Sequence, residues 1–215
     1  MTKRQKLIEI FDKLLERFGP QEWWPADSAF EVAIGAILTQ NTSWQNVERA
    51  IANLKKARCL SFGGLSRLKE KELARLIRPA GYYNIKAGRI RNFLRFLEEN
   101  YRGSLGRMRS KDTGTLRKEL LSVNGIGPET ADSILLYALE KPVFVVDAYT
   151  RRIFSRHRLA GPKADYEALQ RLFMANLTRQ PALFNEYHAL LVKLGKDYCK
   201  KTKAACGICP IYEKK

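Results

Sequence analysis

The chain has 215 residues, of which 45% are hydrophobic and 28% are charged. This composition is typical of a folded globular protein and excludes a disordered one. No apolar segment approaches the roughly 20 residues that span a bilayer, and the charged N-terminus does not resemble a signal peptide. We therefore expect a cytoplasmic protein. Lys and Arg number 39 against 22 Asp and Glu, a net charge of +17, which favours a polyanionic partner such as nucleic acid. A basic surface that serves solubility or thermal stability is the alternative.

Hydrophobic periodicity is helical along almost the whole chain. Apolar residues recur every three or four positions, and turn sequences such as Gly19-Pro20 separate the segments. The segments that we expect to be helical are 7–18, 29–38, 43–54, 73–77, 90–101, 116–121, 131–138, 148–157, 165–177 and 181–195. One short run, Val143–Val146, is β-like. The sequence therefore predicts an all-α fold of about ten helices joined by short loops.

The segment 120–131 combines two glycines with a proline in a way that predicts a tight turn between two helices. Gly125 and Gly127 flank Ile126, and glycine tolerates the backbone angles of such a turn. Pro128 suits the first turn of the following helix. Backbone N–H groups at a helix N-terminus form a site for an anion such as a DNA phosphate. An ordinary glycine-containing linker is the alternative.

Asp147 lies twenty residues after Gly127, within the sequence VVDAYTRR. Together with the hairpin sequence LLSVNGIGPETAD, this segment resembles the helix–hairpin–helix DNA glycosylases of the endonuclease III superfamily. The likeness extends over about residues 20–209 through AILTQNT, AGYYNIKA and the terminal cysteines. The combination of WWP, LTQNT and VVDAYT is most similar to the 3-methyladenine DNA glycosylase branch of that superfamily.

The resemblance implies an all-α fold of two domains with a cleft between them that receives DNA. One domain would be a continuous helical bundle over 27–138, which contains the helix–hairpin–helix. The other would combine 1–26 with 139–215. The implied partner is double-stranded DNA containing a damaged base, bound by a monomer in the cytoplasm at the nucleoid, with no role for a membrane.

Asp147 is the residue that we expect to carry catalysis. Hydrolysis of an N-glycosidic bond builds positive charge on the sugar, which a carboxylate can stabilise while it orients or deprotonates the attacking water. Its place at a helix start also predicts an ordinary N-cap. The two roles are compatible.

Glu129 occupies an informative position in the hairpin. In the bifunctional members of the superfamily, the residue before Thr-Ala is a lysine, whose amine forms an imine with the sugar and leads to strand cleavage. A carboxylate cannot form an imine, so we expect a monofunctional enzyme. Glu129 would then lie at the helix N-terminus, where its charge is favourable, or in the wall of the base pocket. A lysine from elsewhere is the alternative nucleophile.

The base pocket and the DNA contacts follow from the resemblance. Aromatic residues hold a flipped base by stacking, and the implied pocket residues are Trp24, Pro25 and Trp44, with a core role as the alternative for the indoles. Gln40 and Asn41 would fill the gap that the extruded base leaves, or simply form a polar turn. The remaining expected DNA contacts are Lys86, Gly125, Ile126, Gly127, Thr130 and Arg151.

Cys199, Cys206 and Cys209 have the spacing C-x6-C-x2-C. This spacing reproduces the first three ligands of the loop that holds a 4Fe–4S cluster in many relatives. The fourth position is Lys215, so a loop without a cluster remains the alternative. The two histidines, His157 and His188, are not spaced with the cysteines and are expected to be ordinary residues.

The function that these features favour is base excision repair. We expect a DNA glycosylase that hydrolyses the N-glycosidic bond of an alkylated purine such as 3-methyladenine, without strand cleavage. A bifunctional glycosylase/lyase for oxidised pyrimidines is one alternative. A non-catalytic helix–hairpin–helix DNA-binding protein is the alternative from another class.

Overall fold

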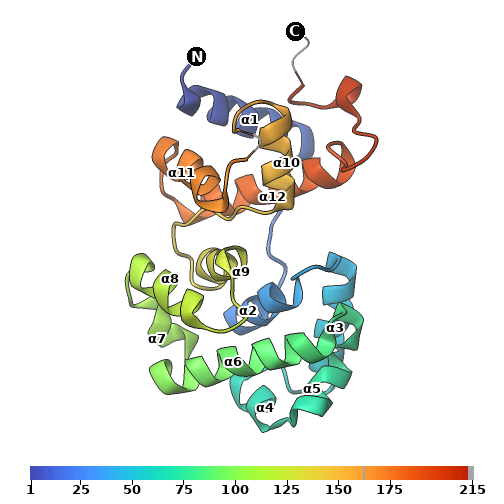
Figure 1. The fold of residues 1–215 in the computed structure, drawn as a ribbon, viewed down its shortest axis with the longest axis vertical. Helices are drawn as coiled ribbons and strands as arrows, with labels where there is room; N and C mark the ends of the chain where they lie inside the picture. Colours follow the sequence, from blue (N-terminus) through green and yellow to red (C-terminus); the bar gives the residue numbers. More distant parts are fainter. Residues whose placement is uncertain (162, 213–215) are drawn as a thin grey trace. The chain divides into compact units, whose positions relative to one another are not determined.

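The computed structural model describes residues 1–161 and 163–212, and the regular secondary structure among these residues is helical, with no strand (Figure 1). The predicted all-α fold is therefore confirmed. The chain divides into two compact units, which are described separately. The continuous unit is Ala26–Lys141, and the terminal unit combines Met1–Pro25 with the chain from Pro142 onward. None of the described helices is both long enough and apolar enough to cross a membrane.

The continuous unit is built around α2 and α6, whose bounds are given below with those of the other elements. In chain order its elements are α2 (Ala29–Leu38), α3 (Trp44–Lys56), α4 (Phe62–Arg67), α5 (Glu70–Leu76), the short η1 (Arg78–Ala80), α6 (Tyr83–Tyr101), α7 (Leu105–Arg109), α8 (Thr113–Ser122), α9 (Pro128–Ser133) and η2 (Ile134–Ala138). The long α6 packs against α2, α4, α5 and α7 (Figure 1). The residues of α2 from Glu31 to Leu38 are all buried, as expected for a helix that is apolar on every face.

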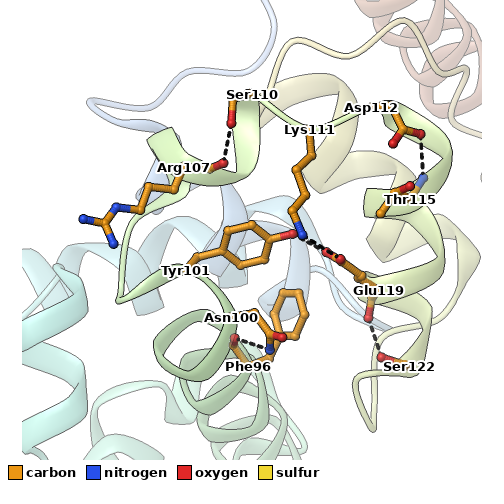
Figure 2. A network of polar contacts seen from close by, with 10 residues as sticks. All are labelled: Phe96, Asn100, Tyr101, Arg107, Ser110, Lys111, Asp112, Thr115, Glu119 and Ser122. Carbon is orange, nitrogen blue, oxygen red and sulfur yellow. Dashed lines mark hydrogen bonds and ion pairs between the residues drawn. The ribbon is translucent and has the colours of Figure 1, made fainter.

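A polar network fixes the start of α8 against the end of α6 (Figure 2). The Lys111 ammonium lies 3.0 Å from the Glu119 carboxylate and 5.0 Å from the centre of the Tyr101 ring. The Tyr101 hydroxyl donates to Glu119, and burial together with this carboxylate raises the pKa of Tyr101. Asp112 caps α8 by accepting the backbone N–H of Thr115 at 2.9 Å. These contacts set the direction of α8, the first helix of the hairpin.

The terminal unit is held by a cluster of aromatic rings. Its elements are α1 (Lys3–Phe18), α10 (Ala148–Arg156), α11 (Tyr166–Asn176), α12 (Pro181–Asp197) and the short η3 (Cys206–Ile208). The rings of Phe144 and Phe173 stack 3.7 Å apart, and the buried Tyr187 hydroxyl donates to the Leu7 carbonyl at 2.8 Å. The β-like run Val143–Val146 is buried but forms no strand. This run is the buried connecting segment that precedes α10.

Candidate functional site

The turn between α8 and α9 has the tight geometry that its glycines predict. Gly125 has a φ of +92°, and a Cβ there would lie 2.3 Å from Cγ of Arg89, so only glycine fits. Gly127 is extended at the N-cap of α9, and a Cβ there would meet nothing within 4 Å. The backbone at Gly127 is therefore open to an approaching ligand. Ile126 is 4% exposed, so its side chain anchors the turn in the core. Contact of this turn with DNA through its backbone stays a prediction.

Gln40 is bound to this turn by its side-chain amide. Its Nε2 donates to the Gly125 carbonyl at 3.0 Å and to the Thr130 hydroxyl at 2.9 Å, while Arg89 donates to its Oε1. Thr130 is buried, and its hydroxyl supports Gln40. The expected contact of Thr130 with DNA stays a prediction. Asn41 is exposed and has a φ of +52°. It presents the polar tip of the same loop.

Lys86 is not a phosphate contact, contrary to the expectation from sequence. Its side chain is 1% exposed, and its ammonium donates to the carbonyls of Leu38 at 2.8 Å and Ala80 at 2.7 Å. Burial, and to a smaller extent the charge of Arg89, lowers the pKa of Lys86 to about 8. Lys86 therefore joins the C-terminal ends of α2 and η1, immediately before the loop that carries Gln40.

A buried ion pair holds the two helices of the hairpin together. Nε of Arg117 in α8 lies 2.8 Å from Oδ1 of Asp132 in α9, and its Nη2 lies 3.0 Å from Oδ2. The Asp132 side chain is fully buried. Such a bidentate contact fixes direction as well as distance, so it sets the angle at which the turn is presented.

Asp147 is the N-cap of α10, and its two oxygens have different neighbours. Oδ1 accepts the backbone N–H of Thr150 at 2.7 Å, which is the predicted N-cap. Oδ2 lies 3.7 Å from Nε2 of His188 in α12. The Asp147 side chain is 12% exposed, so it can be reached while it is largely shielded from water. Burial lowers the pKa of His188, and the Asp147 charge opposes this effect.

The aromatic candidates are half-buried in their respective units. The rings of Trp23 and Trp24 lie 5.2 Å apart, and the adjoining Pro25 is exposed. Trp44 begins α3 and donates its indole N–H to Glu48 at 2.8 Å. None of the three indoles is fully buried, so each keeps part of its surface accessible.

Two expected charged residues are exposed. Glu129 is the second residue of α9, where a carboxylate is favoured by the helix N-terminus. Arg151 lies in the first turn of α10 and donates one N–H to the Ala164 carbonyl at 2.8 Å. Both side chains remain accessible to a ligand.

The three C-terminal cysteines line one cavity of about 340 Å³, together with Arg156 and His157. Burial raises the pKa of the Cys209 thiol, and the nearby Cys199 and Cys206 raise it further. Within residues 1–161 and 163–212, however, no three His, Cys, Asp or Glu side chains are placed so as to hold a metal ion. The described thiols therefore do not form a preorganised cluster site, and the fourth position, Lys215, lies outside the described residues.

Comparison with known proteins assigns the chain to one family. Residues 34–179 match the family described as "HhH-GPD superfamily base excision DNA repair protein". A relative from Methanocaldococcus jannaschii, which carries the name of a DNA repair glycosylase, is 50% identical over 99% of this chain and 96% of its own. Endonuclease III of Thermotoga maritima is 29% identical, over 94% of this chain and 88% of its own.

Two solved structures have similar folds. The 3-methyladenine DNA glycosylase of H. pylori, solved with 1,N6-ethenoadenine, has a TM-score of 0.77 at 28% identity, over 91% of this chain and 98% of its own. A trapped covalent intermediate of an endonuclease III with DNA has a TM-score of 0.82 at 21% identity, over 98% of this chain and 94% of its own. The family match over the hairpin and Asp147, and the relative that is half identical along the chain, show that this protein belongs to the HhH-GPD superfamily of base excision DNA repair proteins.

Proposed function

We propose that this base excision repair glycosylase releases an alkylated purine such as 3-methyladenine from double-stranded DNA by hydrolysis, and that Asp147 carries the reaction. The observation that supports this role most directly is the environment of the carboxylate. One of its oxygens is fixed by the Thr150 amide, and the other faces a buried imidazole. The Thr150 amide therefore holds one oxygen of the carboxylate in place before any substrate arrives.

In the proposed reaction the glycosidic bond breaks as water attacks the sugar carbon. Asp147 would stabilise the positive charge that develops on the sugar and would orient the water or accept its proton. Because the side chain is 12% exposed, its charge acts in a medium less polar than water, where such stabilisation is stronger. The product is a free base and an abasic site.

The aromatic residues favour an alkylated purine as the base. Stacking is worth about 1–3 kcal/mol per base in single-strand binders, and a cationic methylated purine gains about 0.5–2 kcal/mol more over an indole. Trp24 and Trp44 are both half-buried, as stacking residues must be. The H. pylori relative, which is named as a 3-methyladenine DNA glycosylase, supports the same substrate class.

Glu129 favours hydrolysis without strand cleavage. It is exposed at the position where the bifunctional enzymes carry their lysine, and it cannot form an imine. Lys86 is also a poor substitute, because its amine is buried and held by two carbonyls. Product strands should therefore stay intact until alkali is added. A covalent enzyme–DNA adduct trapped with borohydride would overturn this part of the proposal.

A bifunctional glycosylase/lyase acting on oxidised pyrimidines is the second candidate. The observation in its favour is the likeness to proteins named endonuclease III, including one from Thermotoga maritima at 29% identity. The two candidates differ in substrate as well as in strand cleavage. Faster release of thymine glycol than of 3-methyladenine by the wild type would favour the second candidate.

The hairpin would hold the DNA backbone. The open backbone at Gly127 would offer its N–H to a phosphate, and Arg151 would add a phosphate contact in the terminal unit. Asn41, at the tip of its loop, is the exposed candidate for filling the gap beside an extruded base. We propose that the protein acts on DNA as a monomer.

The cysteine loop would have a structural role. In this proposal Cys199, Cys206 and Cys209 supply three ligands of a 4Fe–4S cluster that takes no part in hydrolysis. Their common cavity supports the idea, whereas the lack of a preformed metal arrangement among the described residues speaks against it. Iron and sulfide analysis of the purified protein, with Cys206→Ser as the comparison, distinguishes a loop that binds a cluster from a loop that binds none.

Asp147→Asn provides the central test, because asparagine also caps helices and so preserves the fold. Single-turnover excision should fall by about 10²-fold or more, as expected for loss of a catalytic carboxylate, while DNA affinity stays similar or rises. The chain offers a matched control: Asp165 caps α11 in the same unit and accepts the Ala168 N–H at 2.7 Å. Asp165→Asn should excise at the wild-type rate.

The substrate panel consists of duplex oligonucleotides carrying 3-methyladenine, thymine glycol or uracil, read with and without alkali. An Asp147→Asn protein with normal excision would remove this residue from the mechanism. A wild-type protein that binds every duplex but releases no base would be a DNA-binding protein without catalysis.

A further inference from the structure

His188 lies against the proposed catalytic carboxylate, although nothing in the sequence spacing sets it apart. It belongs to the middle of α12, and its Nε2 is 3.7 Å from Oδ2 of Asp147 at the start of α10. These two helices pack closely within the terminal unit. The contact between His188 and Asp147 therefore depends only on how α10 packs against α12 within the terminal unit.

The surroundings of His188 restrict the motion of its ring. The side chain is 8% exposed. The ring of Phe144 meets it edge-on, with centres 6.4 Å apart and planes at 82°. The neighbouring Tyr187 is fully buried in the same aromatic cluster and is tied to α1 through the Leu7 carbonyl. An imidazole enclosed in this way keeps a fixed orientation toward Asp147.

We propose that His188 is a positioning residue for the Asp147 carboxylate, an inference that rests on the proposed function. The Thr150 amide fixes Oδ1, and the His188 ring would fix Oδ2. Two contacts on different oxygens define the plane of the carboxylate, whereas one contact leaves it free to rotate. A separation of 3.7 Å closes to a hydrogen bond with a small movement, and catalytic hydrogen bonds commonly shorten when substrate binds.

The protonation state of His188 suits this role. Burial lowers its pKa from the ordinary value of 6.5, so the ring is neutral at physiological pH. A neutral imidazole can donate one N–H to the carboxylate without supplying a positive charge that would cancel it. Asp147 then keeps its full negative charge for the developing cation on the sugar.

The alternative is that His188 merely fills the core of the terminal unit. Two substitutions separate the roles: His188→Gln keeps a hydrogen-bond donor on a side chain of similar reach, and His188→Leu keeps apolar volume but has no donor. Tyr187→Phe is the matched control, because it removes a buried hydrogen bond from the same helix without touching Asp147. Thermal unfolding of all three variants reports their stability.

Single-turnover excision of 3-methyladenine at saturating enzyme is the first measurement. His188→Leu should be slower by roughly 10-fold, the loss that one hydrogen bond in the transition state accounts for. His188→Gln should recover to within about threefold of wild type, and DNA affinity should not change. Tyr187→Phe should lose stability but keep its rate. Normal excision by His188→Leu, or equal losses in the Gln and Leu variants, would overturn the proposal.

A second measurement does not depend on activity. The ¹⁵N resonances of the His188 ring, recorded in the intact protein, report which nitrogen carries the proton. They should change in Asp147→Asn and stay the same in Asp165→Asn. An unchanged His188 ring in Asp147→Asn would overturn the positioning role whatever the substrate. If the wild type released no base while the ring still responded to Asp147, the proposed function would fail and the contact would stand.

Discussion

Replacing Arg117 with methionine should destabilise the continuous unit by about 3–5 kcal/mol, the cost of removing one partner from a buried ion pair. Asp132 is fully buried, and both of its oxygens are bound by Arg117 at 2.8 and 3.0 Å. The variant would leave this carboxylate in the core without its bidentate partner. The Arg117 side chain is 23% exposed, so some water can reach the site. We therefore expect the lower end of the range.

The converse and double variants give the energy of the pair itself. Asp132→Leu leaves a guanidinium that can turn toward water, so its cost should be smaller, about 1–3 kcal/mol. The double variant Arg117→Met/Asp132→Leu buries no unpaired charge. Its loss of unfolding free energy should be smaller than the sum of the two single losses by roughly 2 kcal/mol, within the range observed for residues in direct contact.

Urea denaturation followed by circular dichroism measures these differences. A loss of about 3 kcal/mol corresponds to a Tm lower by roughly 6–12 °C in a protein of this size. The matched control is Arg109→Met, since Arg109 and Glu140 form an ion pair whose side chains are 52% and 66% exposed. Exposed pairs contribute about 0–1 kcal/mol. The reasoning about burial is wrong if Arg117→Met lowers the unfolding free energy no more than Arg109→Met does. It is also wrong if the loss in the double variant equals the sum of the two single losses.

Three further predictions concern single residues. Lys86→Met leaves two helix-end carbonyls without their donor and should lower the unfolding free energy by about 1–3 kcal/mol; an unchanged urea midpoint would contradict this. The pKa of His188 is lowered in the folded state, so the unfolded chain binds the proton first as the pH falls through about 6.5. The unfolding free energy should therefore decrease below that pH, and His188→Leu should flatten the dependence. Trp24→Ala and Trp44→Ala should slow excision of 3-methyladenine by roughly 10-fold, about 1.4 kcal/mol, with little loss of Tm; the reverse pattern would indicate core residues.

The helical fold could be predicted because its longer helices carry clear apolar stripes. The structure also contains α4 and α7, which the sequence did not predict. These helices have six and five residues, and a periodic pattern needs a window of about 11–18 residues to be recognised. The helix α6 begins at Tyr83, earlier than the expected residue 90. Its first two turns were missed because their polar residues obscure the stripe.

Gly125 could be predicted because its positive φ requires glycine, and Asp147 could be predicted as an N-cap because it directly precedes a helical stripe. The catalytic role of Asp147 stays a prediction. The role of Lys86 was missed, although a signal was available. Lys86 precedes Ile90 by four residues, and Ile90, Phe93 and Leu97 continue the buried face of α6. A lysine in register with such a stripe points inward, so its ammonium must find partners inside the protein. The same reasoning applies to His188, which precedes the buried Leu191 by three residues in α12.

Several basic residues that contribute to the net charge of +17 serve the interior of the protein. Lys86 and Arg152 bind main-chain carbonyls, Arg89 holds Gln40, and Arg117 pairs with buried Asp132. Their charge still adds to the electrostatic field that attracts a polyanion, but their N–H groups already donate to carbonyls and side chains of the protein. Net charge therefore indicates a polyanionic partner without identifying the residues that touch it. In the hairpin, Arg89 and Arg117 are bound to neighbouring side chains, whereas the backbone at Gly127 is open and is the part of the turn that we propose for phosphate binding.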